Sequence, residues 1–141
     1  MTLDPDGNLC ECGKRGCLQT YIDESALLNE AKRVSRIEEI GQLYDAVRTG
    51  ESWAVEIMER TALYISITVN NIVCLYNPDT VIISGDLAEG YEPIMDLLQQ
   101  HCRTVVWEPF RHSLKVIASE LKGQSIVMGA GALALQESNR I

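Results

Sequence analysis

Three cysteines lie close together near the start of the chain, at Cys10, Cys12 and Cys17. Thiolates are good ligands for Zn²⁺, and Gly13 and Gly16 allow the backbone to fold tightly enough to bring three sulfurs onto one ion. In a chain without a secretory signal, such a cluster favours metal binding over disulfides, and a loop of reduced thiols without metal is the alternative. The spacing therefore predicts a zinc loop.

Three sulfur ligands leave one position of a tetrahedral zinc site open, so a fourth ligand must come from elsewhere. The chain has two histidines, His101 and His112, and their spacing ties neither of them to the loop. The other two cysteines, Cys74 and Cys102, stand alone in apolar segments. We predict that both are small core residues.

Composition and charge narrow the function. The chain has 141 residues, of which 46% are hydrophobic, enough for one domain with a core. It has no apolar run of about 18 residues and begins with polar residues, so we expect a cytoplasmic protein without a membrane span. Its 12 basic and 20 acidic residues give a formal charge of −8. Because binding to DNA phosphates needs clustered Lys and Arg, we expect no direct DNA contact by these residues, which does not exclude a separate DNA-binding domain elsewhere in a longer parent.

The elements that must position the cysteine loop are helical. After an irregular segment over 1–19, apolar residues at helical spacing predict helices over 23–34, 37–47 and 52–76, the last ending before Asn77-Pro78. From Ala62 to Tyr76 the third helix is apolar on nearly every face, which is typical of a helix buried on both sides. The competing interpretation of 63–75 as a strand requires an unusually long strand.

The second half of the sequence alternates strands and helices. Short apolar runs at 80–84 and 114–118 predict strands, the first buried in a parallel or mixed sheet and followed by a turn at Gly85-Asp86. Helices are predicted from Pro93 to Val105 and over 125–136, where small residues at 129–132 favour close packing. The chain is thus expected to be one α/β domain over 1–141, with a zinc loop over 1–19, a helical part over 20–76 and a β-α-β-α part over 77–141.

The segment from Cys10 to Cys17 resembles the signature C-x-C-G-x-x-G-C-x-E of the ROK family of repressors and sugar kinases. The segments 77–85 and 129–133 likewise resemble its NP-x-x-I-V-I-G-G strand and its terminal GAA-x-L helix. The resemblance implies a partial ribonuclease-H-like (actin/hexokinase-type) C-terminal lobe. It also implies zinc held by the three cysteines and by a histidine upstream of Met1. The catalytic Asp loop and the phosphate-binding first lobe are expected outside this chain.

Two positions depart from the family pattern. Gln19 stands where the family has a Glu that hydrogen-bonds a sugar hydroxyl, so it is either a retuned sugar contact or a polar surface residue at a helix start. Ser84, Gly85 and Asp86 replace a glycine-rich stretch that lies close to the nucleotide in ROK kinases, although a simple strand-ending turn explains them equally well. Together the departures favour the repressor branch.

Three functions are therefore compared. The first is the sugar-sensing and oligomerising C-terminal module of a ROK repressor, similar to a xylose repressor, with no catalysis by this segment. The second is the C-terminal part of an ATP-dependent ROK sugar kinase, whose catalytic Asp would lie outside residues 1–141. The third is a zinc-stabilised structural domain without a ligand. The resemblance also implies a sheet without its leading strands, which would leave unpaired edges at 80–84 and 114–118, and we therefore predict a homo-oligomer.

Overall fold

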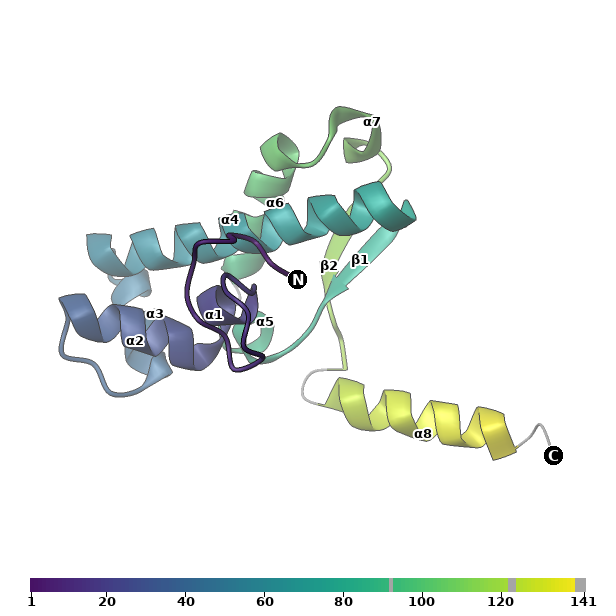
Figure 1. The fold of residues 1–141 in the computed structure, drawn as a ribbon, viewed down its shortest axis with the longest axis horizontal. Helices are drawn as coiled ribbons and strands as arrows, with labels where there is room; N and C mark the ends of the chain where they lie inside the picture. The colour runs from purple at the N-terminus through teal and green to yellow at the C-terminus, as the bar shows by residue number, and fades with distance from the viewer. Residues whose placement is uncertain (92, 122–123, 139–141) are drawn as a thin grey trace.

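The computed structural model describes residues 1–91, 93–121 and 124–138 (Figure 1). A loop over residues 1–18 leads into four helices, the last of which is the longest element of the molecule. They are α1 (Gln19–Ile22), α2 (Glu24–Val34), α3 (Ile40–Arg48) and α4 (Ser52–Tyr76). In Figure 1, α4 forms the long axis of the body, with α2 and α3 against its first half.

Local signals in the sequence explain where these helices begin and end. Asp23 caps α2, because its Oδ1 accepts a hydrogen bond of 3.0 Å from the backbone N–H of Glu24. At the start of α3, Gln42 Oε1 accepts the backbone N–H of Glu39 at 3.1 Å. This cap places the start of α3 at Ile40, three residues later than predicted.

Helix α4 is continuous over the segment for which a strand was the alternative, so the strand interpretation was wrong. It ends where predicted, since Asn77 adopts a left-handed conformation (φ 47°) and Pro78 follows. Packing offsets its many β-branched residues, because the middle of the helix is buried between two sets of neighbours. One side contacts α2 and α3 through residues such as Leu27, Leu43 and Met58.

The other side of α4 packs on a β-α-β unit. Its elements are β1 (Thr80–Ile83), α5 (Asp86–Gly90), α6 (Ile94–Val105), α7 (Glu108–Arg111) and β2 (Lys115–Ala118). The two strands are parallel, in a register that pairs Val81 with Val116 and Ile82 with Ile117. One face of this sheet and α6 bury a second apolar cluster against α4, which includes Val69, Val73 and Leu98. The short helices α5 and α7 were not predicted.

The C-terminal helix differs from the other long helices in its burial. Helix α8 (Ser125–Ser138) forms where it was predicted, but it projects from the body, and its described side chains are exposed (Figure 1). A Cβ added at Gly129 or Gly131 would meet nothing within 4 Å. The close packing expected for residues 129–132 is therefore not found within the part of the chain that is described.

Three predictions of burial need correction. Cys74 is exposed near the end of α4, together with Leu75 (73% exposed) and Tyr76 (77% exposed), so the last turn of α4 is not buried on both sides. Strand β1 is only half-buried, with Ile82 61% exposed. The prediction for Cys102 is confirmed, since it is buried on α6.

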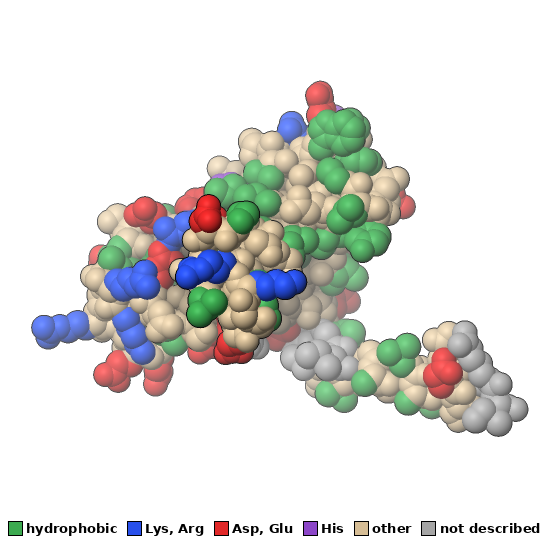
Figure 2. All heavy atoms as spheres, viewed as in Figure 1, with side chains coloured by type: hydrophobic (Ala, Val, Ile, Leu, Met, Phe, Trp, Pro, Cys, Tyr) green, Lys and Arg blue, Asp and Glu red, His purple; other side chains and the backbone are tan. Residues whose placement is uncertain are grey.

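Hydrophobic side chains gather on the surface around α7 and the adjoining end of α4, and over α8 (Figure 2).

The prediction of a helix-rich α/β fold is confirmed. Among residues 1–91, 93–121 and 124–138, none of the helices combines the length and the apolar character that crossing a bilayer requires.

Candidate metal centre and the adjoining cavities

The cysteine loop is a tight turn closed by backbone hydrogen bonds. The N–H of Gly13 donates to Cys10 O at 2.9 Å, and the N–H of Cys10 donates to Lys14 O at 2.8 Å. An antiparallel bridge between Leu9 and Arg15 flanks the turn. Gly13 has φ +81°, a conformation that side chains disfavour, which explains a glycine at this corner.

A second glycine fixes the loop to the first residues of the chain. Gly16 has φ +64°, and a Cβ built there would lie 1.5 Å from Asp4 O, so only glycine fits. Its carbonyl accepts the N–H of Leu3 at 2.7 Å. Next to it, Thr2 and Cys17 form an antiparallel bridge. The backbone at the start of the chain therefore runs directly beside the third cysteine.

The three thiol sulfurs converge. All three Sγ atoms lie within 4.8 Å of one another, and Cys12 Sγ is 3.6 Å from Cys17 Sγ. Two thiolates on one tetrahedral zinc, each about 2.3 Å from the ion, are separated by about 3.8 Å. Cys10 and Cys17 are buried, whereas Cys12 is exposed. The spacing of the three sulfurs is compatible with one divalent cation held by all of them.

Hydrogen bonds within the loop shift the pKa values of the Cys12 and Cys17 thiols in opposite directions. The backbone N–H of Lys14 lowers the pKa of Cys12, and the thiol of Cys17 lowers it further. The pKa of Cys17 is raised to about 11, because it donates to Cys12 and because burial disfavours its thiolate. Without metal, Cys12 therefore forms a thiolate more readily than Cys17, and a cation that binds both sulfurs must displace the proton of Cys17.

The loop also positions the start of α1. Thr20 Oγ1 donates to Cys17 O at 2.8 Å, and Tyr21 Oη accepts the backbone N–H of Asn8 at 3.4 Å. The ring of Tyr21 packs on that of Tyr64 in α4, with centroids 4.8 Å apart. Helix α1 begins two residues after Cys17. A metal ion on the sulfurs would therefore hold both the loop and the start of α1 against α4.

Gln19 lies at the junction of two cavities. It is the exposed first residue of α1 and lines a cavity of 460 Å³ that Asn8, Arg60 and Tyr64 also line. It also lines a second cavity of 460 Å³, which Ser84 and Gly85 line as well. The structure thus brings together the two positions at which the sequence departs from the family pattern.

The expected turn after β1 is the start of a helix. Ser84 and Gly85 are exposed, and Gly85 (φ +112°) is the N-cap residue of α5. Asp86 is the first residue of α5, and its side chain lies outside the described part of the structure. The short α5 thus occupies the place where only a turn was predicted.

Sequence reasoning missed Arg60 and Tyr64, which come from α4 to the wall of the first cavity. Arg60 also forms an ion pair with Glu30 of α2. One signal could have identified them. Arg60 and Tyr64 are four residues apart, so they lie on one face of a helix whose other residues in this region are mainly apolar.

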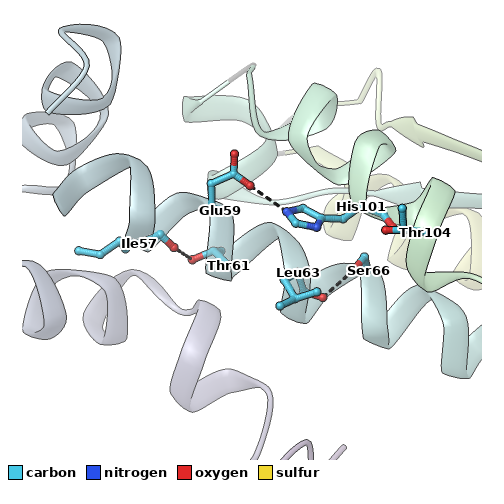
Figure 3. A network of polar contacts seen from close by, with 7 residues as sticks. All are labelled: Ile57, Glu59, Thr61, Leu63, Ser66, His101 and Thr104. Atoms are coloured by element: carbon cyan, nitrogen blue, oxygen red, sulfur yellow. Dashed lines mark hydrogen bonds and ion pairs between the residues drawn. The ribbon is translucent and has the colours of Figure 1, made fainter. Parts of the chain in front are cut away.

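Among the described residues, neither histidine belongs to the group of possible metal ligands formed by the cysteine sulfurs. His101 Nε2 lies 2.9 Å from Glu59 Oε2, so it links α6 to α4 (Figure 3). The same view shows the hydroxyls of Thr61 and Ser66 bonded to carbonyls within α4. Within the described residues, the group of possible metal ligands around the loop consists of the three cysteines.

Comparison with known proteins agrees with these features. The model of the ROK family matches residues 1–137. The xylose repressor of Bacillus spizizenii is 21% identical over 136 residues, which cover 96% of this chain and 35% of the repressor. The kanosamine kinase of Amycolatopsis mediterranei is 32% identical over 135 residues, which cover 95% of this chain and 44% of the kinase.

The fold is shared as well. The crystal structure of the ROK hexokinase from Thermus thermophilus superposes with a TM-score of 0.82 at 23% identity, covering 97% of this chain and 47% of the hexokinase chain. The chain thus spans between about a third and about a half of the length of these three relatives. The match over nearly every residue and the cysteine loop lead to one conclusion: the chain belongs to the ROK family.

Proposed function

We propose that this chain is the sugar-sensing and oligomerising C-terminal module of a ROK-family transcriptional repressor, without catalysis by the segment itself. In this proposal residues 1–141 are a single ribonuclease-H-like lobe. The parent protein is cytoplasmic and contacts DNA through a separate N-terminal domain. Oligomerisation uses the helices and the strand edges that have no partner among the described residues.

Zinc has a structural role in this proposal. Cys10, Cys12 and Cys17 hold the ion, with a histidine outside this chain as the fourth ligand. Bound zinc would supply folding energy and hold the loop in one conformation, as in closed zinc sites generally. An ordered loop would also fix the position of Gln19, because Thr20 and Tyr21 connect the start of α1 to the loop by hydrogen bonds.

One observation carries the proposal: Gln19, Ser84 and Gly85 line a single cavity. A glutamine amide can donate and accept hydrogen bonds with sugar hydroxyls, but it lacks the charge that strengthens the bonds of a glutamate. The hydroxyl of Ser84, which lines the same cavity, is a second neutral group of this kind. The carboxylates of Asp23 and Glu24 line the same cavity and would repel a nucleotide phosphate, so its lining suits reversible binding of a sugar.

The test is calorimetric titration of sugars into a longer polypeptide that includes this chain and the region upstream of it. D-Xylose, N-acetylglucosamine and glucose are the first probes. We expect one sugar to bind, and Gln19→Ala to weaken its affinity about tenfold, equivalent to one polar contact. Gln100→Ala, at an exposed position of α6, is the matched control and should leave the affinity unchanged. Absence of binding by every sugar would leave the purely structural role as the explanation.

The alternative is the C-terminal part of an ATP-dependent sugar kinase, and the 32% identity to kanosamine kinase favours it. In that case the general base that activates the sugar hydroxyl lies outside residues 1–141. An assay of ATP consumption with the same sugars separates the two functions. Phosphorylation by the longer polypeptide would establish the kinase, and the chain over 1–141 alone should be inactive in both cases.

A further inference from the structure

A third cavity lies far along the chain from the metal loop, beside α6, α7 and β2. Its volume is 630 Å³, within the range of sites for small molecules. None of the residues that line it also lines the two cavities around Gln19. The cavity therefore requires an explanation of its own.

The charge around this cavity is opposite to that of the chain. Among the described residues, three permanent cations line it, Arg103, Arg111 and Lys115, together with His112, and one carboxylate, that of Glu108. The cavity thus carries two net positive charges when His112 is neutral, in a chain of net charge −8. Cations gathered in a concave site raise the local concentration of anions. The ligand is therefore expected to be an anion.

One of the cations is already fixed in position. Arg111 Nε donates to Val106 O at 2.5 Å, and its Nη2 donates to Thr104 O at 3.0 Å. These bonds use two of the five N–H donors of the guanidinium and tie it to the C-terminal end of α6. A side chain that is ordered before binding loses less entropy when a ligand arrives. Arg103 and Lys115 are exposed like Arg111, but their side chains form no hydrogen bond or ion pair with the described residues, so they can adapt to a ligand.

The floor of the cavity is apolar. Cys102, Val106 and Val116 line it and are all buried. Burial raises the pKa of Cys102 to about 11, so the thiol stays neutral at physiological pH and adds no negative charge. An inorganic anion would leave this apolar surface without a partner. A ligand that matches both parts has a charged head and an apolar body.

We propose that this cavity binds a phosphate monoester with an apolar body, held by Arg103, Arg111 and Lys115 at the phosphate and by the buried side chains at the body. A phosphate monoester carries between about 1.5 and 2 negative charges near neutral pH, which matches the net charge of the cavity. Planar guanidinium groups also bind phosphate oxygens in pairs. The site is independent of the proposed sugar site, because the two share no residue.

The test is calorimetric titration of phenyl phosphate into the chain over 1–141, with inorganic phosphate and benzyl alcohol as probes that each lack one half of the ligand. We expect phenyl phosphate to bind at least tenfold more tightly than either of them. Amide NMR shifts should change at residues 102–117. Weaker binding of phenyl phosphate than of inorganic phosphate would overturn the proposal.

A matched pair of double variants separates the site from overall charge. Arg103→Gln with Lys115→Gln removes two cations of the cavity, and Lys32→Gln with Arg36→Gln removes two exposed cations elsewhere. We expect the first pair to weaken phenyl phosphate binding at least tenfold and the second to change it less than twofold. Arg111 is left in place because it holds the end of α6. Equal weakening by both pairs, or tight binding of an acidic peptide along the open edge of β2 instead of phenyl phosphate, would contradict the proposal.

Discussion

Helices α4 and α8 are both rich in apolar residues, yet their surroundings differ completely. Helix α4 is packed between α2 and α3 on one side and α6 with the sheet on the other. Helix α8 exposes Val127, Met128, Leu133 and Leu135, each by more than half of its surface. An apolar helix can thus be covered or exposed, and a neighbouring element decides whether its surface is buried. On this basis α8 has the surface of a buried helix without its partner.

The largest expected difference between the two regions is in the free energy of unfolding. Leu98 of α6 is fully buried against α4, so Leu98→Ala should destabilise the chain by about 2–5 kcal/mol. Leu133 of α8 is 64% exposed, and Leu133→Ala should change stability by less than about 0.5 kcal/mol. Urea unfolding of each variant, compared with the unmodified chain at the same concentration, measures both. Equal losses would mean that α8 packs on the body in solution.

The second prediction compares two cysteines, of which only Cys102 lies in the packed interior. Its pKa of about 11, against an ordinary 9.0, lowers its thiolate fraction about 100-fold at pH 8. Iodoacetamide should therefore modify the exposed Cys74 at least about 100-fold faster than Cys102, as followed by peptide mass spectrometry. Since the thiolate forms as pH approaches 11, the rate at Cys102 should rise about tenfold per pH unit up to that point. Similar rates at pH 8 would show that α6 opens readily.

The third prediction compares two glycines. Gly16 has no room for a Cβ, so Gly16→Ala should displace the loop from Asp4 and lower zinc affinity at least tenfold, as measured by competition against Co²⁺ absorbance. Gly131 of α8 has open space around it, and Gly131→Ala should leave zinc affinity unchanged. It should also favour the helix by up to about 1 kcal/mol. Unchanged affinity in both variants would exclude this loop as the zinc site.

The smallest expected effect concerns the contact between α4 and α6. Glu59 and His101 are partly exposed, and an ion pair of this kind contributes less than about 1 kcal/mol. Glu59→Gln should therefore lower the free energy of unfolding by less than that amount. Glu56→Gln, at an exposed position of the same helix, is the control and should be neutral. A loss above 2 kcal/mol for Glu59→Gln would mean that the pair organises the α4–α6 contact.

Much of the fold could be predicted from local signals. Asp23 as a cap and Asn77-Pro78 as a stop defined helix ends, and both strands were placed to within one residue. What failed depends on neighbours distant in sequence. The apolar setting of Cys74 indicated burial, but no element covers the end of α4 within the described residues. The short helices α5 and α7 have too few residues for a periodic pattern.

The candidate metal site could be predicted more fully than the cavities. Three cysteines and two glycines lie in one short segment, so their spacing alone constrains the geometry. Gln19 and Ser84, in contrast, share a cavity only because α1 and the end of β1 both lie against α4. No local pattern contains that contact. The basic cavity beside α7 was missed for the same reason, since its cations come from three different elements.

The bridge between Thr2 and Cys17 has a practical consequence for recombinant work. Any residues fused ahead of Met1 would emerge beside the sulfurs, tethered there at an effective concentration in the millimolar range. A polyhistidine tag at this end would place imidazoles within reach of the three thiols, so metal binding by a tagged chain would not report on the thiols alone. Purification handles for metal measurements therefore belong at the opposite terminus or must be removed by protease.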